Sequence, residues 1–156
     1  VRYMKKILLS FSLLFILNVA NGQTLLEPIS KVITRVKSPG NTKEIAYIGM
    51  RCGTLYALVA AYFENNGNPT DVPTIQEMRR QSEIFTRVGV SLDMTINKMS
   101  SEDIKKQGAS LINYYAKMMS EGNKQNKNAV TPVIETDLDS CKAEAEGYGQ
   151  ISAKIK

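Results

Sequence analysis

The sequence has 156 residues, of which 43% are hydrophobic and 22% are charged, with a formal net charge of +5. This length is typical of one ordinary domain, and the apolar content is too high for a wholly disordered chain. Histidine is absent, which excludes Ser-His-Asp and Cys-His catalysis and zinc sites that use histidine.

Residues 1–22 have the three parts of a secretory signal peptide. A basic start at residues 4–6 precedes an apolar run over residues 7–20, and small residues typical of a cleavage site follow at 20–22. The apolar run is shorter than the roughly 20 residues that a helix needs to span a bilayer. We therefore predict export to the periplasm or the cell exterior, and a mature chain over residues 23–156.

Most of the net positive charge lies in this signal segment. Without Arg2, Lys5 and Lys6, the remainder carries 17 basic and 15 acidic residues, a net charge of +2. So small a charge, scattered along the chain, does not form the basic patch that nucleic-acid binding requires. We expect no nucleic-acid partner.

Two N-terminal helices are predicted in the mature chain. Apolar residues three and four apart over residues 23–40 favour a helix or an extended arm, ended by Pro39 and Gly40. Asn41 lies three residues before Glu44, an arrangement typical of a helix start. The helix that begins there ends at the Asn- and Gly-rich stretch 65–69.

The apolar part of this second helix, residues 45–63, admits two interpretations. Small residues at spacing four, which are Gly49, Gly53, Ala57 and Ala61, indicate close contact with a neighbouring helix. The same length and spacing are also found in membrane helices. Arg51 inside this segment opposes the membrane interpretation, so membrane association after signal cleavage is the less favoured alternative.

The third helix is predicted to open at Thr74, with Glu77 completing a capping box. Residues 88–90, where Gly89 stands between two valines, also allow a bend or a break in this helix. Ser100 begins the fourth helix, which we expect to end at Gly122.

An exposed loop is predicted over residues 122–131, because this stretch is polar and has no periodicity. Thr131 and Pro132 then open the last helix, whose end should fray at Gly147 and Gly149.

Four to five amphipathic helices predict a small all-α bundle in a single domain over residues 23–156. Cys52 and Cys141 are the only two cysteines, and each lies on the apolar face of its predicted helix. An even cysteine count after a signal peptide predicts that one disulfide staples the bundle. The alternative is a pair of separate buried thiols.

Carboxylates are the remaining acid–base groups, and they are densest in the last helix: Glu135, Asp137, Asp139, Glu144 and Glu146. A suitably spaced pair could hydrolyse glycosides, although acidic residues near a helix start also stabilise its dipole. Arg51 is the one charged residue between Ile45 and Phe63. It is a candidate ligand contact, or else a side chain whose stem packs at the edge of the apolar face.

The sequence thus favours an exported, non-enzymatic interaction module, such as a binder, an inhibitor or a chaperone-like protein. We expect an unknown protein or envelope partner. No residue is assigned to catalysis, cofactor binding or metal ligation. The alternatives are a carboxylate-based glycan hydrolase and a membrane-associated protein that uses helix 45–63.

Overall fold

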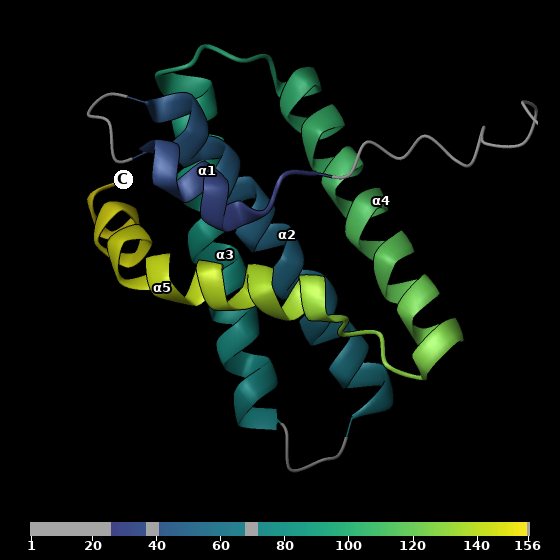
Figure 1. Ribbon diagram of the computed structural model, residues 1–156. Coiled ribbons are helices and arrows are strands. Elements are labelled where there is room, and N and C mark those ends of the chain that lie inside the picture. The colour runs from purple at the N-terminus through teal and green to yellow at the C-terminus, as the bar shows by residue number, and fades with distance from the viewer. Residues whose placement is uncertain (1–25, 37–40, 68–71, 156) are drawn as a thin grey trace, which may run out of the picture.

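The computed structural model describes residues 26–36, 41–67 and 72–155, and within these ranges it contains five helices and no strand (Figure 1). The helices are α1 (Ile29–Val36), α2 (Thr42–Asn66), α3 (Val72–Thr95), α4 (Ser101–Asn126) and α5 (Pro132–Lys154). The predicted all-α bundle with one disulfide is therefore confirmed. The predicted signal peptide lies outside the described residues.

Three helices begin where the capping residues of the sequence indicate. The side chains of Asn41, Ser100 and Thr131 each accept a hydrogen bond from the backbone N–H three residues later. These bonds satisfy N–H groups that have no acceptor within the helix. The starts of α2, α4 and α5 were therefore predictable from local sequence alone.

The third helix differs from its prediction at the start and in the middle. It begins at Val72 and not at Thr74, because Pro73 fits the first helical turn, where no N–H bond is needed. It also continues without a break past Gly89 to Thr95. This glycine serves packing, as described below, and not a bend.

The predicted exposed loop at 122–131 is too long. The helix α4 continues to Asn126, and Lys127 ends it in the left-handed conformation at φ 54°. Gly122 is buried, and a Cβ there would lie 2.8 Å from the carbonyl oxygen of Asn128. The glycine lets the following chain fold back against α4, and Ala129 in this segment is buried as well. Similarly, α5 does not fray at its glycines but extends to Lys154.

The helices α2 and α3 form an antiparallel hairpin whose backbones touch. A Cβ added to Gly49 would lie 2.8 Å from the carbonyl oxygen of Phe85, and one added to Gly89 would lie 2.8 Å from the backbone nitrogen of Met50. Gly53 meets Thr86 in the same way. The predicted use of the small-residue stripe in close helix packing is confirmed for Gly49 and Gly53, and Gly89 of α3 makes the matching close approach.

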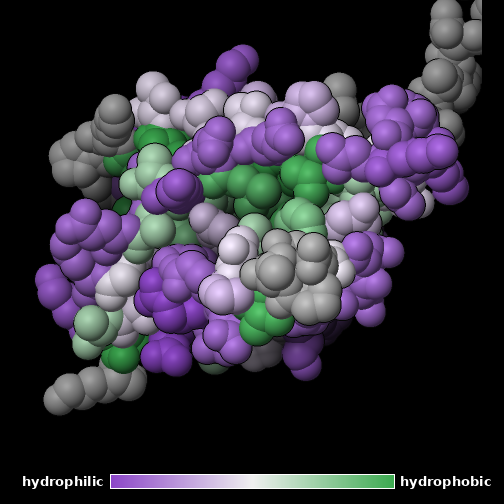
Figure 2. Space-filling model, turned by 90° about the horizontal axis from the view of Figure 1, so that it is seen from below, coloured by the Kyte–Doolittle hydropathy of each residue, from purple (hydrophilic) through white to green (hydrophobic). Residues whose placement is uncertain are grey.

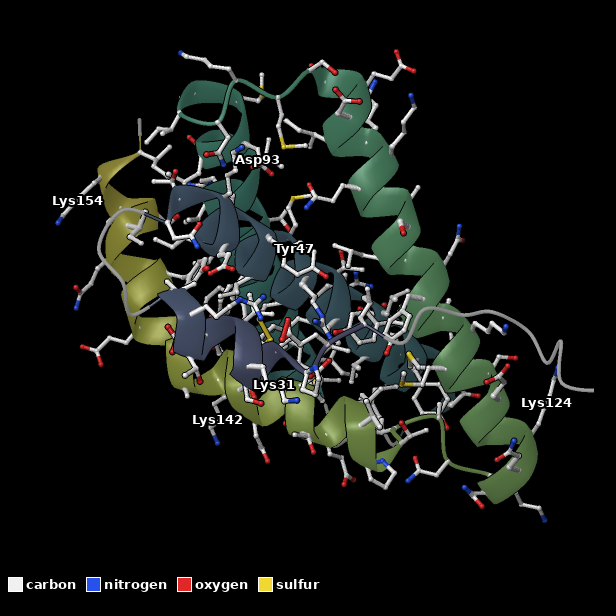
Figure 3. The ribbon with its side chains drawn as sticks, turned by 45° about the horizontal axis from the view of Figure 1, so that its top comes forward. Lys31, Tyr47, Asp93, Lys124, Lys142 and Lys154 are labelled. Carbon is white, nitrogen blue, oxygen red and sulfur yellow. A yellow bond between two sulfur atoms is a disulfide. The ribbon has the colours of Figure 1, made fainter. Side chains whose placement is uncertain are left out.

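The other helices cover this hairpin. The short α1 and the long α5 lie across one side of it, and α4 lies along another (Figure 1). Buried apolar residues of all five helices form the core, among them Leu55, Phe85 and Tyr115. From below, apolar residues gather in the middle of the surface and polar residues frame them (Figure 2). Lys124, Lys142 and Lys154 point away from the bundle (Figure 3).

In length and composition, α2 is the one helix of the described residues that could cross a membrane. In the structure 61% of its most apolar window is buried inside the protein. A core helix of a folded domain meets the same two criteria, and here α2 has neighbours on several sides.

Candidate functional site

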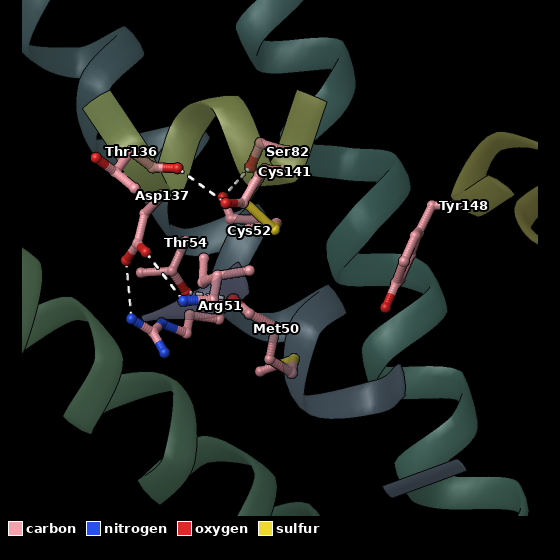
Figure 4. Close-up of a disulfide and its surroundings, with 12 residues drawn as sticks. Met50, Arg51, Cys52, Thr54, Ser82, Thr136, Asp137, Cys141 and Tyr148 are labelled. Atoms are coloured by element: carbon pink, nitrogen blue, oxygen red, sulfur yellow. Dashed lines mark hydrogen bonds and ion pairs between the residues drawn. A yellow bond between two sulfur atoms is a disulfide. The ribbon is translucent and has the colours of Figure 1, made fainter. Parts of the chain in front are cut away.

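The disulfide joins the middle of α2 to α5. Cys52 and Cys141 are bonded with their Cα atoms 5.6 Å apart, and both residues are fully buried. The bond spans 89 residues of sequence. It fixes the point at which α5 crosses α2 (Figure 4).

A buried ion pair lies beside the disulfide and joins the same two helices. Arg51 directly precedes Cys52, and Asp137 lies one helical turn before Cys141. The Nη2 atom of Arg51 is 2.8 Å from Oδ2 of Asp137, and each side chain is 1% exposed. Removing two charges from water is costly unless their remaining polar atoms are also bonded, so the neighbours of this pair determine whether it is stable.

Tyr115 of α4, a third helix, forms hydrogen bonds with both residues of the ion pair. The Nε of Arg51 donates to the hydroxyl oxygen of Tyr115 at 2.7 Å, and that hydroxyl donates to Oδ2 of Asp137 at 2.7 Å. Burial raises the pKa of Tyr115 above its ordinary value. Burial lowers the pKa of Arg51, but the hydrogen bond to Tyr115 and the negative charge of Asp137 outweigh this effect, and the net pKa of Arg51 is raised. The guanidinium is therefore charged and the phenol is protonated at neutral pH.

The remaining bonds of the pair go to the main chain at the start of α1. We define residues 26–36, which comprise a short non-helical stretch and α1, as the N-terminal arm. The Nη1 of Arg51 donates to the carbonyl oxygen of Glu27. The N–H of Ile29 donates to Oδ1 of Asp137 at 3.1 Å. The two charged side chains thus bind one acceptor and one donor of the arm, on either side of Pro28.

Apolar side chains of the arm fill the space around this network. Ile29 is fully buried and Val32 is 2% exposed. Leu26 packs against two groups of core residues, one of which is formed by Met50, Ile104 and Leu111. The arm is thus held by two main-chain hydrogen bonds, by aliphatic side chains and by the ion pair of Arg35 with Glu44 of α2.

Two hollows lie at the surface near the arm. One, of about 280 Å³, lies between Pro28 and the first turns of α5 and reaches Asp137. The other, of about 270 Å³, lies between α1, α2 and α5. Its lining is mostly aliphatic, with Tyr148, Gly147 and one carboxylate, Glu144.

The structure brings together only some of the residues singled out in the sequence. Arg51, the candidate ligand contact, directly precedes Cys52 of the disulfide and binds the protein's own main chain. Of the acidic group in α5, Asp137 is buried, whereas Glu135, Asp139 and Glu146 are exposed. Among the described residues, no three of His, Cys, Asp and Glu are grouped so that they could hold a metal ion.

Sequence reasoning missed Asp137 and Tyr115 as the partners of Arg51. A signal for Asp137 was present, because it lies three residues after Ile134 and four before Cys141, on the apolar face of α5. A carboxylate at such a position is buried and needs a cation. For Tyr115, the sequence offers no cue that separates it from the other tyrosines.

Comparison of this chain with protein families, with curated proteins and with solved structures found no match.

Proposed function

We propose that this protein is an exported, non-enzymatic interaction module whose ligand is a polypeptide. The proposal depends on one observation: the buried Arg51–Asp137 pair binds a main-chain carbonyl and a main-chain N–H. The signal-like segment at residues 1–22 and the disulfide support export, since disulfides persist in oxidising compartments.

The chemistry of the pair suits binding of a peptide main chain. Hydrogen bonds to charged groups are about twice as strong as those between neutral groups, and they gain further where water is excluded. Both side chains are 1% exposed. Arg51 binds the main-chain carbonyl that precedes Pro28, and Asp137 binds the main-chain N–H that follows it. A site that binds both of these groups recognises a polypeptide rather than a small solute.

The same geometry disfavours Asp137 as the catalytic carboxylate of a hydrolase. Its Oδ1 accepts from Ile29, and its Oδ2 accepts from Arg51 and Tyr115. A general acid or nucleophile must reach the substrate. The exposed carboxylates of α5 are the residues on which the glycan-hydrolase hypothesis now depends. One experiment can test both polypeptide binding and glycan hydrolysis.

The test combines co-purification with an activity assay. Immobilised mature chain is exposed to an envelope extract of its host, and any captured protein is purified and titrated against the free chain. We expect saturable binding of one partner at a fixed stoichiometry, and no turnover of glycan substrates. Glycan hydrolysis that disappears in Glu135→Gln or Asp139→Asn would contradict the proposal and favour the hydrolase.

A further inference from the structure

The N-terminal arm packs against α2 and α5 as a bound peptide would, and we call the surface of these helices that it covers the cleft. Its first residues are non-helical, and their polar contacts with the buried pair are made by backbone atoms alone. Its apolar contacts are made by aliphatic side chains, with Ile29 fully buried. Peptide-binding proteins commonly divide recognition in this way, with main-chain bonds giving affinity and side-chain pockets giving specificity.

The contacts define the class of segment that fits the cleft. Any polypeptide supplies the carbonyl and the N–H that Arg51 and Asp137 bind. The position of Ile29 requires an aliphatic side chain, because a polar group buried there without a partner would be destabilising. The cleft therefore selects an extended, apolar segment that turns into a helix.

A hollow at the surface adjoins the arm and the cleft. The hollow of about 280 Å³ is bounded by Pro28 of the arm and by Pro132, Val133 and Thr136 of α5. It adjoins Asp137, which anchors the arm. A segment with a larger side chain in the place of Pro28 would bury apolar surface that the arm does not.

We propose that the N-terminal arm is the built-in occupant of a peptide-binding cleft, and that a partner protein binds by inserting an extended apolar segment in its place. The hollow favours a foreign segment over the arm of a second copy, since a second copy brings the same proline and leaves the same space. This inference rests on the proposed function and specifies its partner and its site. The arm then acts as a competitor that a partner must displace.

The test measures binding of a fluorescent synthetic peptide with the sequence of residues 23–36 to the mature chain by anisotropy. Ile29→Val weakens the protein's own arm but not the peptide, so the peptide should bind this variant about 2- to 10-fold more tightly than the wild type. Ile112→Val makes the same change at an exposed position of α4 and should leave binding unchanged.

Two altered peptides test the atoms involved. A peptide N-methylated at Ile29 cannot donate to Asp137, and its affinity should fall by about tenfold or more. A peptide carrying Pro28→Phe reaches the hollow and should bind at least about threefold more tightly than the unmodified peptide.

The outcomes separate this inference from the function on which it rests. Absence of saturable peptide binding to the folded Ile29→Val variant overturns the arm-displacement inference, as does equal binding of the N-methylated peptide. Weaker binding of the Pro28→Phe peptide, together with arm-exchanged dimers of the wild type, would assign the cleft to a second copy. An envelope partner captured in spite of these failures would leave the proposed function standing and place its site elsewhere.

Discussion

The two contacts of α2, with α3 and with α5, are built in opposite ways. Toward α3, glycines remove the side chains, and the two backbones meet directly. Toward α5, the contact depends on a disulfide and an ion pair, which join residues 89 and 86 positions apart in sequence. The first contact is specified by a repeated local pattern, and the second by a few individual residues. The contact with α3 should therefore be destabilised by adding atoms, and the contact with α5 by removing single side chains.

The largest effect is expected from removing the disulfide. The double substitution Cys52→Ala and Cys141→Ala opens a loop of 89 residues, and loop-closure entropy predicts a loss of about 4 to 5 kcal/mol in the free energy of unfolding. Urea unfolding of the oxidised wild type and of the double variant measures this loss. A midpoint unchanged within error would mean that α5 is held by the remaining contacts alone.

Removing one partner of the ion pair should be nearly as damaging. Asp137→Ala leaves the Arg51 charge buried and unpaired, which we expect to lower the free energy of unfolding by about 3 to 5 kcal/mol. Asp139→Ala, two residues away and exposed, is the matched control and should change stability by less than about 0.5 kcal/mol.

Replacing both charges sharpens this prediction. The double variant Arg51→Met, Asp137→Leu has no unpaired buried charge. We therefore expect it to recover most of the stability lost in Asp137→Ala. Equal losses in the single and the double variant would show that the cost lies in the hydrogen bonds lost by Ile29 and Tyr115, and not in an unpaired charge.

The glycine contact should respond to the addition of a single methyl group. In Gly89→Ala, the new Cβ would meet the backbone of α2 at 2.8 Å, and overpacking should outweigh the gain in helix propensity, with a net loss of about 1 to 2 kcal/mol. In Gly147→Ala, the new Cβ has no neighbour within 4 Å, so the same change should stabilise α5 by up to about 1 kcal/mol. Thermal unfolding of the two variants side by side tests this opposite sign.

The last predicted effect is a loss of stability that is confined to alkaline pH. Burial raises the pKa of Tyr115 and of Tyr148 above the ordinary value near 10. Above pH 10 the unfolded chain releases these protons while the folded chain retains them, so stability falls as pH rises, by about 1.4 kcal/mol per pH unit for each tyrosine. Below pH 10 both states are protonated and this contribution is constant.

Urea unfolding between pH 9 and 11 measures this slope. Tyr148→Phe removes the hydrogen bond from the hydroxyl to the carbonyl oxygen of Ile45 at every pH. It should in addition reduce the slope of unfolding free energy against pH above pH 10 by about 1.4 kcal/mol per pH unit. A slope that is the same in the variant and in the wild type would show that Tyr148 is not buried in its protonated form.

The sequence predicted the elements whose cause is local. Asn41, Ser100 and Thr131 begin helices because each side chain bonds a backbone N–H three residues away, a relation visible in the sequence itself. The disulfide was predictable because two cysteines allow one pairing. Gly122 was misread as a helix end because its reason lies in a tertiary contact with residues that follow the helix.

The candidate site was predictable only in part. Arg51 was noticed as a charge in an apolar helix, but its partners come from α4, α5 and the arm, and no local spacing links them. Asp137 was grouped with the exposed carboxylates of α5, although its place on the apolar face distinguishes it from them. Long-range polar pairs depend on the tertiary arrangement, which hydrophobic periodicity does not determine.

The central claim, that the buried ion pair binds the main chain of the arm, is tested most directly by amide hydrogen exchange at Ile29. This residue is the first of α1, where a helix supplies no acceptor for its N–H, so protection there must come from Asp137. We predict that the Ile29 amide exchanges much more slowly than that of Ser30, the next residue and an exposed one, and that Asp137→Ala removes the difference. Equally fast exchange at Ile29 and Ser30 in the wild type would contradict the claim.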